Sequence, residues 1–287
     1  MKPGQQTKPN HLRIGCCGSM ISPSTDPIGV EIVESLAQFG FDYLELSLSG
    51  LAALPPPAFS SLQRRIERSG IPCEACNNFF PPRVRLTGSE ARLPVALDFA
   101  RSAMERAASL GVRIIVFGSA GAKNVPRGFP KDVAWKQIVE LLQHLGPIAA
   151  QHGITIAIEP LNQQESNIIN LASEGLDLVR AVNHPNIQLL IDYYHLMMEK
   201  ENLDIILTAG PAVRHVHFAQ VAGRAFPTVE HEDYARFFDC LRQTGYAGRY
   251  SIEAYTHDFA ADAPRALQLL RNLNIRFNHV ENLCQKT

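Results

Sequence analysis

The sequence has no excess of charge of either sign and no long apolar segment. Its 287 residues include 27 basic and 28 acidic side chains, which leave a formal net charge of −1. Without a basic excess, nucleic acid is not expected as a partner. No apolar run approaches the roughly 18 residues that suggest a membrane span, and the polar first ten residues lack the apolar core of a signal peptide. We therefore expect a soluble cytoplasmic protein with no membrane partner.

Cysteine spacings that indicate a metal site are also nearly absent. Among the six cysteines, Cys73 and Cys76 have the CxxC spacing, but neither a second such pair nor a nearby pair of histidines accompanies them. The two cysteines fall inside an apparent strand, where residues three apart point to opposite faces, so one ion would not easily reach both. We expect buried, reduced thiols.

What the sequence does contain is a regular alternation of strand-like and helix-like segments. Phrases such as GVRIIVF and GITIAIE begin with a glycine that ends a helix and continue as an apolar, β-branched run. Extended segments are expected at 11–17, 42–47, 72–77, 112–118, 154–159, 187–192, 213–219 and 249–255. Amphipathic helical segments are expected at 29–39, 91–110, 132–152, 173–182 and 232–245.

This alternation indicates the α/β class with a parallel sheet. The chain is somewhat longer than the roughly 250 residues typical of one (β/α)₈ TIM barrel, and eight strands favour that closed barrel over an open sheet. No linker rich in proline, glycine or serine divides the chain. We therefore predict a flexible tail at residues 1–10 and a single barrel domain at residues 11–287.

Four residues of the kinds that bind metals lie at or near the ends of four successive apolar runs. They are Glu159 in ITIAIE, Asp192 in IQLLID, His217 in VRHVHF and Glu253 in RYSIE, separated by 33, 25 and 36 residues. A TIM barrel collects the carboxyl ends of its strands around one pocket. Two Glu, one Asp and one His form an oxygen and nitrogen ligand set for a divalent ion, with Mn²⁺ or Mg²⁺ favoured and Co²⁺ or Zn²⁺ also compatible.

The alternation of side chains along the strands agrees with such a site. In ITIAIE, the three isoleucines share one face, which suits packing against helices, and Ala157 and Glu159 share the other. By the same count Asp192 shares its face with Leu190, and His217 shares its face with His215. Glu253 falls on the face of Ser251. One register thus points all four candidate ligands into the barrel at the same end.

The phrases IEPLN, DYYH, HVHFAQ and SIEAY, together with RIGCCGS and EACNNFFPP, resemble the xylose-isomerase-like TIM barrels. The resemblance runs from residue 12 to about residue 275 and is nearest to the ketose 3-epimerases and hydroxypyruvate isomerase. It implies that Glu159, Asp192, His217 and Glu253 hold one metal ion, and that the two glutamates act as acid and base on opposite faces of the substrate. It also implies that His195 and Glu165 contact the substrate, and that the protein is a homodimer or homotetramer.

The loop after His217 departs from the epimerase pattern. The epimerases carry an arginine six residues after this histidine, where this chain has Gly223, and Arg224 comes one place later. The phrase HVHFAQVAGR is more similar to the loop of hydroxypyruvate isomerase, which usually has glutamine at the position of His217. The sequence therefore lies between the two subfamilies.

The chemistry that these residues support is proton abstraction next to a carbonyl group. A divalent ion stabilises the enediolate that forms when the proton leaves, and a carboxylate acts as the base. Return of a proton to the opposite face gives an epimer, and return to the adjacent carbon gives an aldose–ketose isomer. We predict a metal-dependent isomerase or epimerase of carbohydrate metabolism. Its small-molecule substrate is a sugar, a sugar phosphate or a hydroxy-keto acid.

Three alternatives stay open. A dehydratase of a cyclic polyol or of dehydroshikimate would use the same metal and the same proton abstraction. An abasic-site endonuclease would need three zinc ions and more ligands on the early strands, where His11, Glu45 and Glu74 are the available candidates. A non-catalytic sugar-binding barrel is the third, and the intact set of four ligands argues against it.

Several other polar residues are assigned smaller roles. Asn77, at the end of the third expected strand, is expected to line the pocket, and Arg224 to bind a hydroxyl, carboxylate or phosphate group of the substrate. Lys123 and Arg127 are assigned to a surface loop rather than to a phosphate site. Glu45 and Glu74 are expected to form buried pairs and receive no functional role.

Overall fold

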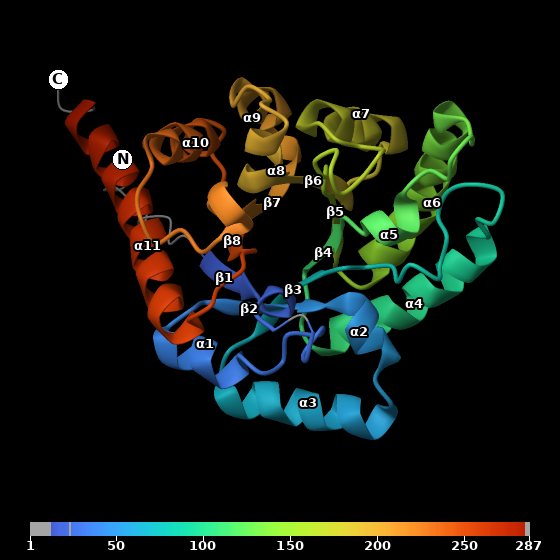
Figure 1. The fold of residues 1–287 in the computed structure, drawn as a ribbon, viewed down its shortest axis with the longest axis horizontal. Coiled ribbons are helices and arrows are strands. Elements are labelled where there is room, and N and C mark those ends of the chain that lie inside the picture. The colour runs from blue at the N-terminus through green and yellow to red at the C-terminus, as the bar shows by residue number, and fades with distance from the viewer. Residues whose placement is uncertain (1–12, 23, 285–287) are drawn as a thin grey trace, which may run out of the picture.

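The computed structural model describes residues 13–22 and 24–284, and these form one closed barrel of eight parallel strands (Figure 1). Each strand pairs with the next, and the last pairs with the first. The expected tail at residues 1–10 lies outside the described residues. The strands are β1 (Arg13–Cys17), β2 (Tyr43–Ser47), β3 (Cys73–Asn77), β4 (Ile114–Phe117), β5 (Thr155–Ile158), β6 (Ile187–Asp192), β7 (Val213–Phe218) and β8 (Arg249–Ile252). All eight lie within the segments that the sequence predicts, and the predicted TIM barrel is confirmed.

Helices surround the barrel (Figure 1). The five expected helices are found as α1 (Val33–Phe39), α4 (Leu93–Ser109), α6 (Lys131–Gln151), α7 (Ala172–Val182) and α10 (Glu232–Gln243). Two further long helices are α3 (Pro56–Ser69) and α11 (Phe259–Cys284). Shorter elements are η1 (Gly18–Met20), α2 (Leu48–Ala53), α5 (Ala120–Lys123), α8 (Tyr193–Met198), α9 (Asp204–Ala209), η2 (Gly210–Ala212) and η3 (Ala222–Arg224). Several of these short elements follow strands, where they shape the mouth of the barrel.

The interior of the barrel is a small apolar cluster separate from the core between the strands and helices. The interior cluster consists of Tyr43, Ala75, Ile114, Val116, Ala157 and Leu190. The alternate residues of β5, such as Ile156 and Ile158, pack in the outer core instead. The predicted strand phase is therefore confirmed. Gly15 makes room for the large Tyr43 ring, because a Cβ atom at Gly15 would lie 2.3 Å from it.

Five cysteines, Cys16, Cys17, Cys73, Cys76 and Cys240, are buried and free, as expected. The expectation that Cys73 and Cys76 point to opposite faces is wrong. The register of β3 against β2 shifts between Leu44 and Glu45, and this irregularity breaks the simple alternation along β3. Both cysteines lie in the outer core, and burial together with the neighbouring Cys73 thiol raises the pKa of Cys76.

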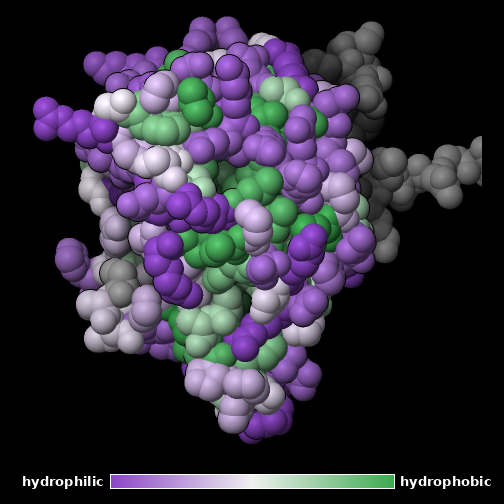
Figure 2. All heavy atoms as spheres, turned by 90° about the vertical axis from the view of Figure 1, so that its right-hand side faces the viewer, coloured by the Kyte–Doolittle hydropathy of each residue, from purple (hydrophilic) through white to green (hydrophobic). Residues whose placement is uncertain are grey.

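The outer surface varies in polarity around the barrel. On the side that carries α4, α5 and α6, apolar side chains gather in a band bordered by polar ones (Figure 2). Val95 in α4 and Val133 in α6 are both exposed. Across the described part of the chain, no helix combines the length and the apolar character needed to cross a membrane.

Candidate metal centre and active site

The carboxyl ends of β5 to β8 bring together the four residues that the sequence singles out as ligands. Glu159 follows β5, Asp192 ends β6, His217 lies in β7, and Glu253 follows β8. All four are buried, and one potential ligand atom from each lies within 4.8 Å of those of the others. Residues that are far apart in the sequence thus meet in one pocket because neighbouring parallel strands end at the same edge.

His217 is the centre of this group. Its Nδ1 atom lies 3.0 Å from Oε1 of Glu159 and 3.2 Å from Oε2 of Glu253. Burial opposes a charge on the ring, but Glu253 and Glu45 outweigh it and raise the pKa of His217 well above its usual value. The edge of the ring that carries Nδ1 therefore faces two carboxylates, as a metal ligand must face the other members of its set.

Asp192 has one carboxylate oxygen that is satisfied and one that is not. Oδ1 accepts a hydrogen bond from the backbone N–H of Tyr194 at 2.7 Å, and so caps the start of α8. Oδ2 is buried and has no hydrogen-bond partner. An unpaired buried acceptor costs free energy unless a donor or an ion satisfies it. The donor set and this free oxygen fit a divalent ion that prefers oxygen and imidazole ligands.

The carboxylates of the pocket do not share one electrostatic environment. Burial raises the pKa of Glu159, and the charge of Glu253 raises it further. Burial also raises the pKa of Asp192, in spite of the opposing effect of Arg224. For Glu253, the effect of burial is outweighed by His217 and Arg224, which lower its pKa. Strongly shifted carboxylates grouped in one cleft are typical of functional sites.

A glycine next to the site fixes where the Glu159 carboxylate lies. Gly118 directly follows β4, and a Cβ atom there would lie only 2.0 Å from Oε2 of Glu159. Any larger residue would displace the carboxylate. Gly118 was not predicted as a site residue, although a small residue directly after a barrel strand was a signal that could have indicated it.

His195, expected to contact the substrate, is buried beside the ligand group. Its Nδ1 atom accepts hydrogen bonds from the backbone N–H of Asn162 at 3.1 Å and from the Asn162 side-chain amide at 2.8 Å. The acceptor role of Nδ1 places the proton on Nε2, which lies 3.6 Å from Oδ2 of Asp192. The ring therefore presents an N–H group to the pocket. Asn162, which holds it, was not predicted, although it lies in the IEPLN phrase.

Arg224 reaches the pocket in spite of its offset position in the loop. Gly223 and Arg224 both have positive φ angles, of 70° and 46°, and this local turn lets the side chain lie over the mouth. Its Nη1 atom lies 3.2 Å from Oε1 of Glu165, and its Nη2 atom donates to Glu253. The guanidinium also lies over the ring of Tyr194, 4.9 Å from its centroid. A non-glycine residue in this backbone region is strained, which supports a role in the site.

The structure also places Asn77 and Lys123 in contact with the two glutamates. Asn77 ends β3 and donates from Nδ2 to Oε1 of Glu253 at 2.9 Å. The assignment of Lys123 to a surface loop is wrong, because the short helix α5 turns this side chain inward. It is fully buried and donates from Nζ to the backbone carbonyl of Glu159 at 3.1 Å. Burial lowers the pKa of Lys123 to about 8. Arg127 is exposed, as the surface-loop assignment predicts.

Glu45 and Glu74 both form pairs, but at two different depths of the barrel: the pairs of Glu45 are buried, as expected, and those of Glu74 are partly exposed. Glu74 pairs with Arg13 and Arg249 at the amino-terminal end. Glu45 is fully buried beneath the ligand group and contacts His217. The alternation in YLELS, with both leucines facing the outer core, was the signal that Glu45 points inward.

Comparisons of the sequence and of the structure with known proteins point to the same family. Residues 33–273 match the family model described as xylose isomerase-like TIM barrel. A D-psicose 3-epimerase of Ruminiclostridium cellulolyticum is 26% identical over 236 residues, which cover 78% of this chain and 77% of that protein. A putative hydroxypyruvate isomerase of Xenopus laevis is 29% identical over 141 residues, covering 46% of this chain and 51% of that protein.

A solved structure of a D-psicose 3-epimerase in the presence of D-fructose superposes on this structure with a TM-score of 0.81. The superposition covers 92% of this chain and 99% of that chain, at 20% sequence identity. At this identity, the likeness establishes that the two chains share their fold.

Proposed function

Because the chain belongs to the xylose isomerase-like TIM barrel family, we propose that it is a divalent-metal-dependent epimerase or isomerase of a neutral sugar. The observation that carries the proposal is the convergence of Glu159, Asp192, His217 and Glu253 in one buried pocket. The named relatives that the chain matches include epimerases and an isomerase. Mn²⁺ or Mg²⁺ suits three carboxylates and one imidazole best.

The four converging residues would hold the ion. A bound divalent cation would supply the positive charge that stabilises a negative oxygen next to the reacting carbon. Glu159 directly follows β5 and Glu253 directly follows β8, three strands further around the barrel, and both reach the same nitrogen of His217. Carboxylates placed in this way can remove a proton from one face of a substrate carbon and return one to the other face.

The remaining polar groups would bind and orient the sugar. His195 presents its Nε2–H to the pocket, and Arg224 presents donors held in place by Glu165 and the Tyr194 ring. Asn77 fixes one oxygen of Glu253. These donors suit the hydroxyl and carbonyl oxygens of a ketose, because groups held in place before binding lose little freedom when the substrate arrives.

The charge of the site favours a neutral substrate. Five carboxylates lie in the pocket or directly beneath it: Glu45, Glu159, Glu165, Asp192 and Glu253. Arg224 pairs with three of these carboxylates, and the buried Lys123 donates to the backbone carbonyl of Glu159. With the five carboxylates ionised, the histidines neutral, and Arg224 and Lys123 charged, a divalent ion would still leave one negative charge. A sugar phosphate or a hydroxy-keto acid would bring a further anion into this pocket, and like charges in a buried site repel strongly.

The alternatives to this proposal differ in what they require of the site. A hydroxypyruvate isomerase would have to accept a carboxylate, which the negative pocket disfavours. An endonuclease with three zinc ions would need free ligands on the early strands. Among the described residues of those strands, the carboxylate of Glu45 is already paired with histidines and that of Glu74 with arginines, so neither is a free ligand. A dehydratase needs the same ligands as an epimerase, and its product would distinguish it.

The test combines metal analysis with product analysis. Protein purified without chelator and reconstituted with Mn²⁺ is expected to contain one ion per chain by elemental analysis. Incubation with neutral ketoses in D₂O is expected to yield an epimer or an aldose with deuterium at the carbon next to the carbonyl, visible by NMR. Three zinc ions, a dehydrated product, or no bound ion and no exchange would each overturn the proposal. Size-exclusion chromatography with light scattering checks the expected homodimer or homotetramer.

A further inference from the structure

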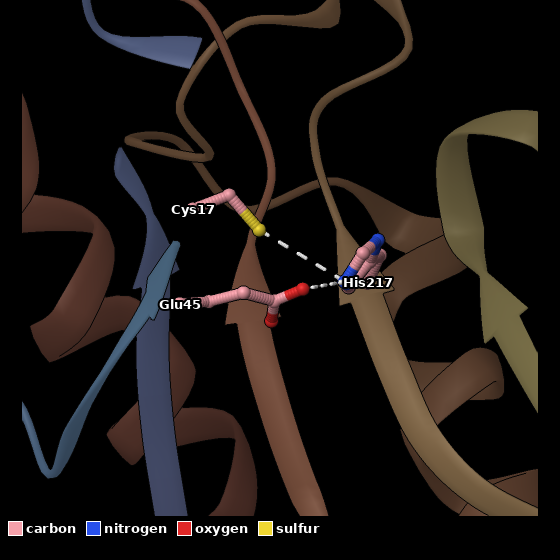
Figure 3. Close-up of side chains that lie close together, drawn as sticks. All are labelled: Cys17, Glu45 and His217. Carbon is pink, nitrogen blue, oxygen red and sulfur yellow. Dashed lines mark hydrogen bonds and ion pairs between the residues drawn. The ribbon is translucent and has the colours of Figure 1, made fainter. Parts of the chain in front are cut away.

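The His217 ring lies between two sets of side chains. Its Nδ1 edge faces Glu159 and Glu253, and its Nε2 atom lies 3.0 Å from Oε1 of Glu45. Glu45 comes from β2, and the thiol of Cys17, which ends β1, lies 3.9 Å from the same Nε2 atom. Figure 3 shows Cys17 and Glu45 both pointing at this edge of the ring. One histidine thus has candidate partners on both of its nitrogens.

Glu45 is held in place by donors on its second oxygen as well. Oε2 lies 2.9 Å from Nε2 of His215 and accepts a hydrogen bond from the hydroxyl of Ser251. The Ser251 hydroxyl in turn lies 2.8 Å from the hydroxyl of Tyr43, which belongs to the interior cluster. The carboxylate is therefore anchored to the packed interior of the barrel.

The protonation of His215 supports the acceptor role of Glu45. The Nδ1 atom of His215 is buried and has no hydrogen-bond partner. A proton on that atom would be a buried donor without an acceptor, which costs free energy. The proton of a neutral ring therefore lies on Nε2 and is donated to Glu45. Glu45 thus serves as an ionised acceptor for two histidine N–H groups and one hydroxyl group.

We propose that Glu45 is the positioning residue for His217 as a metal ligand. Glu45 accepts a hydrogen bond from Nε2–H of His217. In the neutral ring this keeps the proton on Nε2 and orients the lone pair of Nδ1 toward Glu159, Asp192 and Glu253. Metal-binding histidines commonly donate their other N–H to a carboxylate, which sets the ring orientation and raises its basicity. The proposal rests on the metal dependence inferred above and adds a residue that does not contact the ion.

The same contacts argue against a separate metal site at Cys17, Glu45 and His217. Those three residues could hold an ion in principle, but the ion would have to replace the proton that His217 shares with Glu45. The Glu45 oxygens are already used by His215, His217 and Ser251. Cys17 makes only a long contact with the ring. Cys17 is therefore a suitable control, because it touches the same nitrogen without a positioning role.

The test compares Mn²⁺ binding by the full chain, by Glu45→Gln and by Cys17→Ala, with affinities measured by calorimetry or by electron paramagnetic resonance. Glutamine has the size of glutamate, but its single oxygen and its N–H₂ group cannot accept from all the donors around Glu45. We expect Glu45→Gln to weaken Mn²⁺ binding about 10- to 100-fold, as loss of an outer partner of a metal ligand does. Cys17→Ala is expected to stay within about twofold of the unsubstituted chain, because a structural thiol adds no ligand.

A second measurement needs no substitution, and so remains informative if Glu45→Gln does not fold. In the unsubstituted chain loaded with Zn²⁺, which is diamagnetic, ¹⁵N NMR of the histidine rings reports which nitrogen carries the proton. The proposal requires a proton on Nε2 of His217 and metal on Nδ1. The reverse assignment would overturn it.

The outcomes separate this inference from the proposed function. If the unsubstituted chain binds no divalent ion, both are overturned. If it binds Mn²⁺ and Glu45→Gln binds equally well, Glu45 has no positioning role and the proposed function stands. If Cys17→Ala loses the ion, the metal lies on the Nε2 side of His217, and the assigned role of Glu45 is wrong.

Discussion

At the amino-terminal end of the barrel, the single carboxylate of Glu74 pairs with two arginines. At the carboxyl-terminal end, three carboxylates share a single arginine. Glu74 on β3 contacts Arg13 on β1 and lies 2.6 Å from Nε of Arg249 on β8. At the other end, Arg224 contacts Glu253 and lies 3.2 Å from Glu165 and 3.6 Å from Asp192. Glu74 has an arginine for each of its oxygens, whereas at the mouth one arginine is shared and the pKa of Asp192 stays raised in spite of it.

Exposure to solvent strengthens this contrast. The Arg13 side chain is 41% exposed and Arg249 is 25% exposed, so water screens the pairs at the amino-terminal end. The Asp192 side chain is only 1% exposed, and water cannot compensate its charge. We propose that incompletely compensated buried charge marks the end of the barrel that binds a ligand, and that compensated charge marks the end that closes the barrel.

The largest effect expected from this contrast is on turnover. Glu159→Gln and Glu253→Gln are each expected to abolish measurable turnover, a loss of about 10²- to 10⁴-fold or more, because each removes a proton-transfer group. The matched variant Glu74→Gln changes a glutamate of the same barrel and should keep its activity. Steady-state kinetics, with circular dichroism to check folding, makes the comparison. Normal activity in either mouth variant would refute the acid–base assignment.

The next effect is on metal affinity. Asp192→Asn keeps an oxygen that accepts from the backbone N–H of Tyr194, so the start of α8 should remain capped. It loses the oxygen Oδ2, which has no hydrogen bond and lies 3.6 Å from His195 and Arg224. We expect Mn²⁺ affinity to fall by more than the roughly 10- to 100-fold that loss of an outer partner causes, with thermal stability nearly unchanged.

Calorimetric titration with Mn²⁺ measures that change, and Asp192→Ala provides the comparison. The alanine variant removes both the ligand and the helix cap, so it should lose the ion and also unfold at a lower temperature. An Asp192→Asn protein that binds Mn²⁺ as tightly as the unsubstituted chain would show that this residue is not a ligand.

A smaller effect is expected at the arginine that bridges the mouth. Arg224→Lys keeps the charge but loses the planar group that contacts Glu165 and Glu253 and lies over Tyr194. We expect kcat/KM for the sugar to fall about 10- to 100-fold, in line with the loss of one or two charge-assisted hydrogen bonds. Arg214→Lys, at an exposed arginine of β7, is the matched control. Equal kinetics in both variants would remove Arg224 from the binding site.

The sequence was sufficient to predict the barrel and the meeting of the four candidate ligands. Both follow from local patterns, because the two-residue alternation sets the face of each side chain and strand order sets its neighbours. Ala157 and Leu190 lie inside the barrel, as that alternation predicts. Helix α3 was less accessible to prediction, because three consecutive prolines obscure its start: Pro55 precedes the helix, and Pro56 and Pro57 are its first two residues. Proline is nevertheless well tolerated in the first turn of a helix.

The parts that could not be predicted depend on contacts distant in sequence or on unusual backbone angles. Glu45 and Glu74 look alike in the sequence, yet only Glu45 meets His217, 172 residues away. The shift in register between β2 and β3 disturbed the alternation near Cys73. Arg224 comes one position later than the arginine of the epimerase pattern and reaches the pocket through a turn with two positive φ angles. A glycine in the sequence indicates that such a turn can form, but it does not specify the geometry of the turn.

The smallest predicted effect concerns the amino-terminal end, where Glu74→Gln should change stability and leave chemistry intact. Removing this carboxylate leaves Arg13 and Arg249 near each other without a counter-charge, although their exposure to water limits the loss. We expect the free energy of unfolding to fall by about 1 kcal/mol, the upper part of the range for screened ion pairs. Urea denaturation of the metal-free protein measures this change. If kcat/KM instead fell tenfold while stability was unchanged, compensated charge would not mark a purely structural end, and the contrast between the two ends would fail.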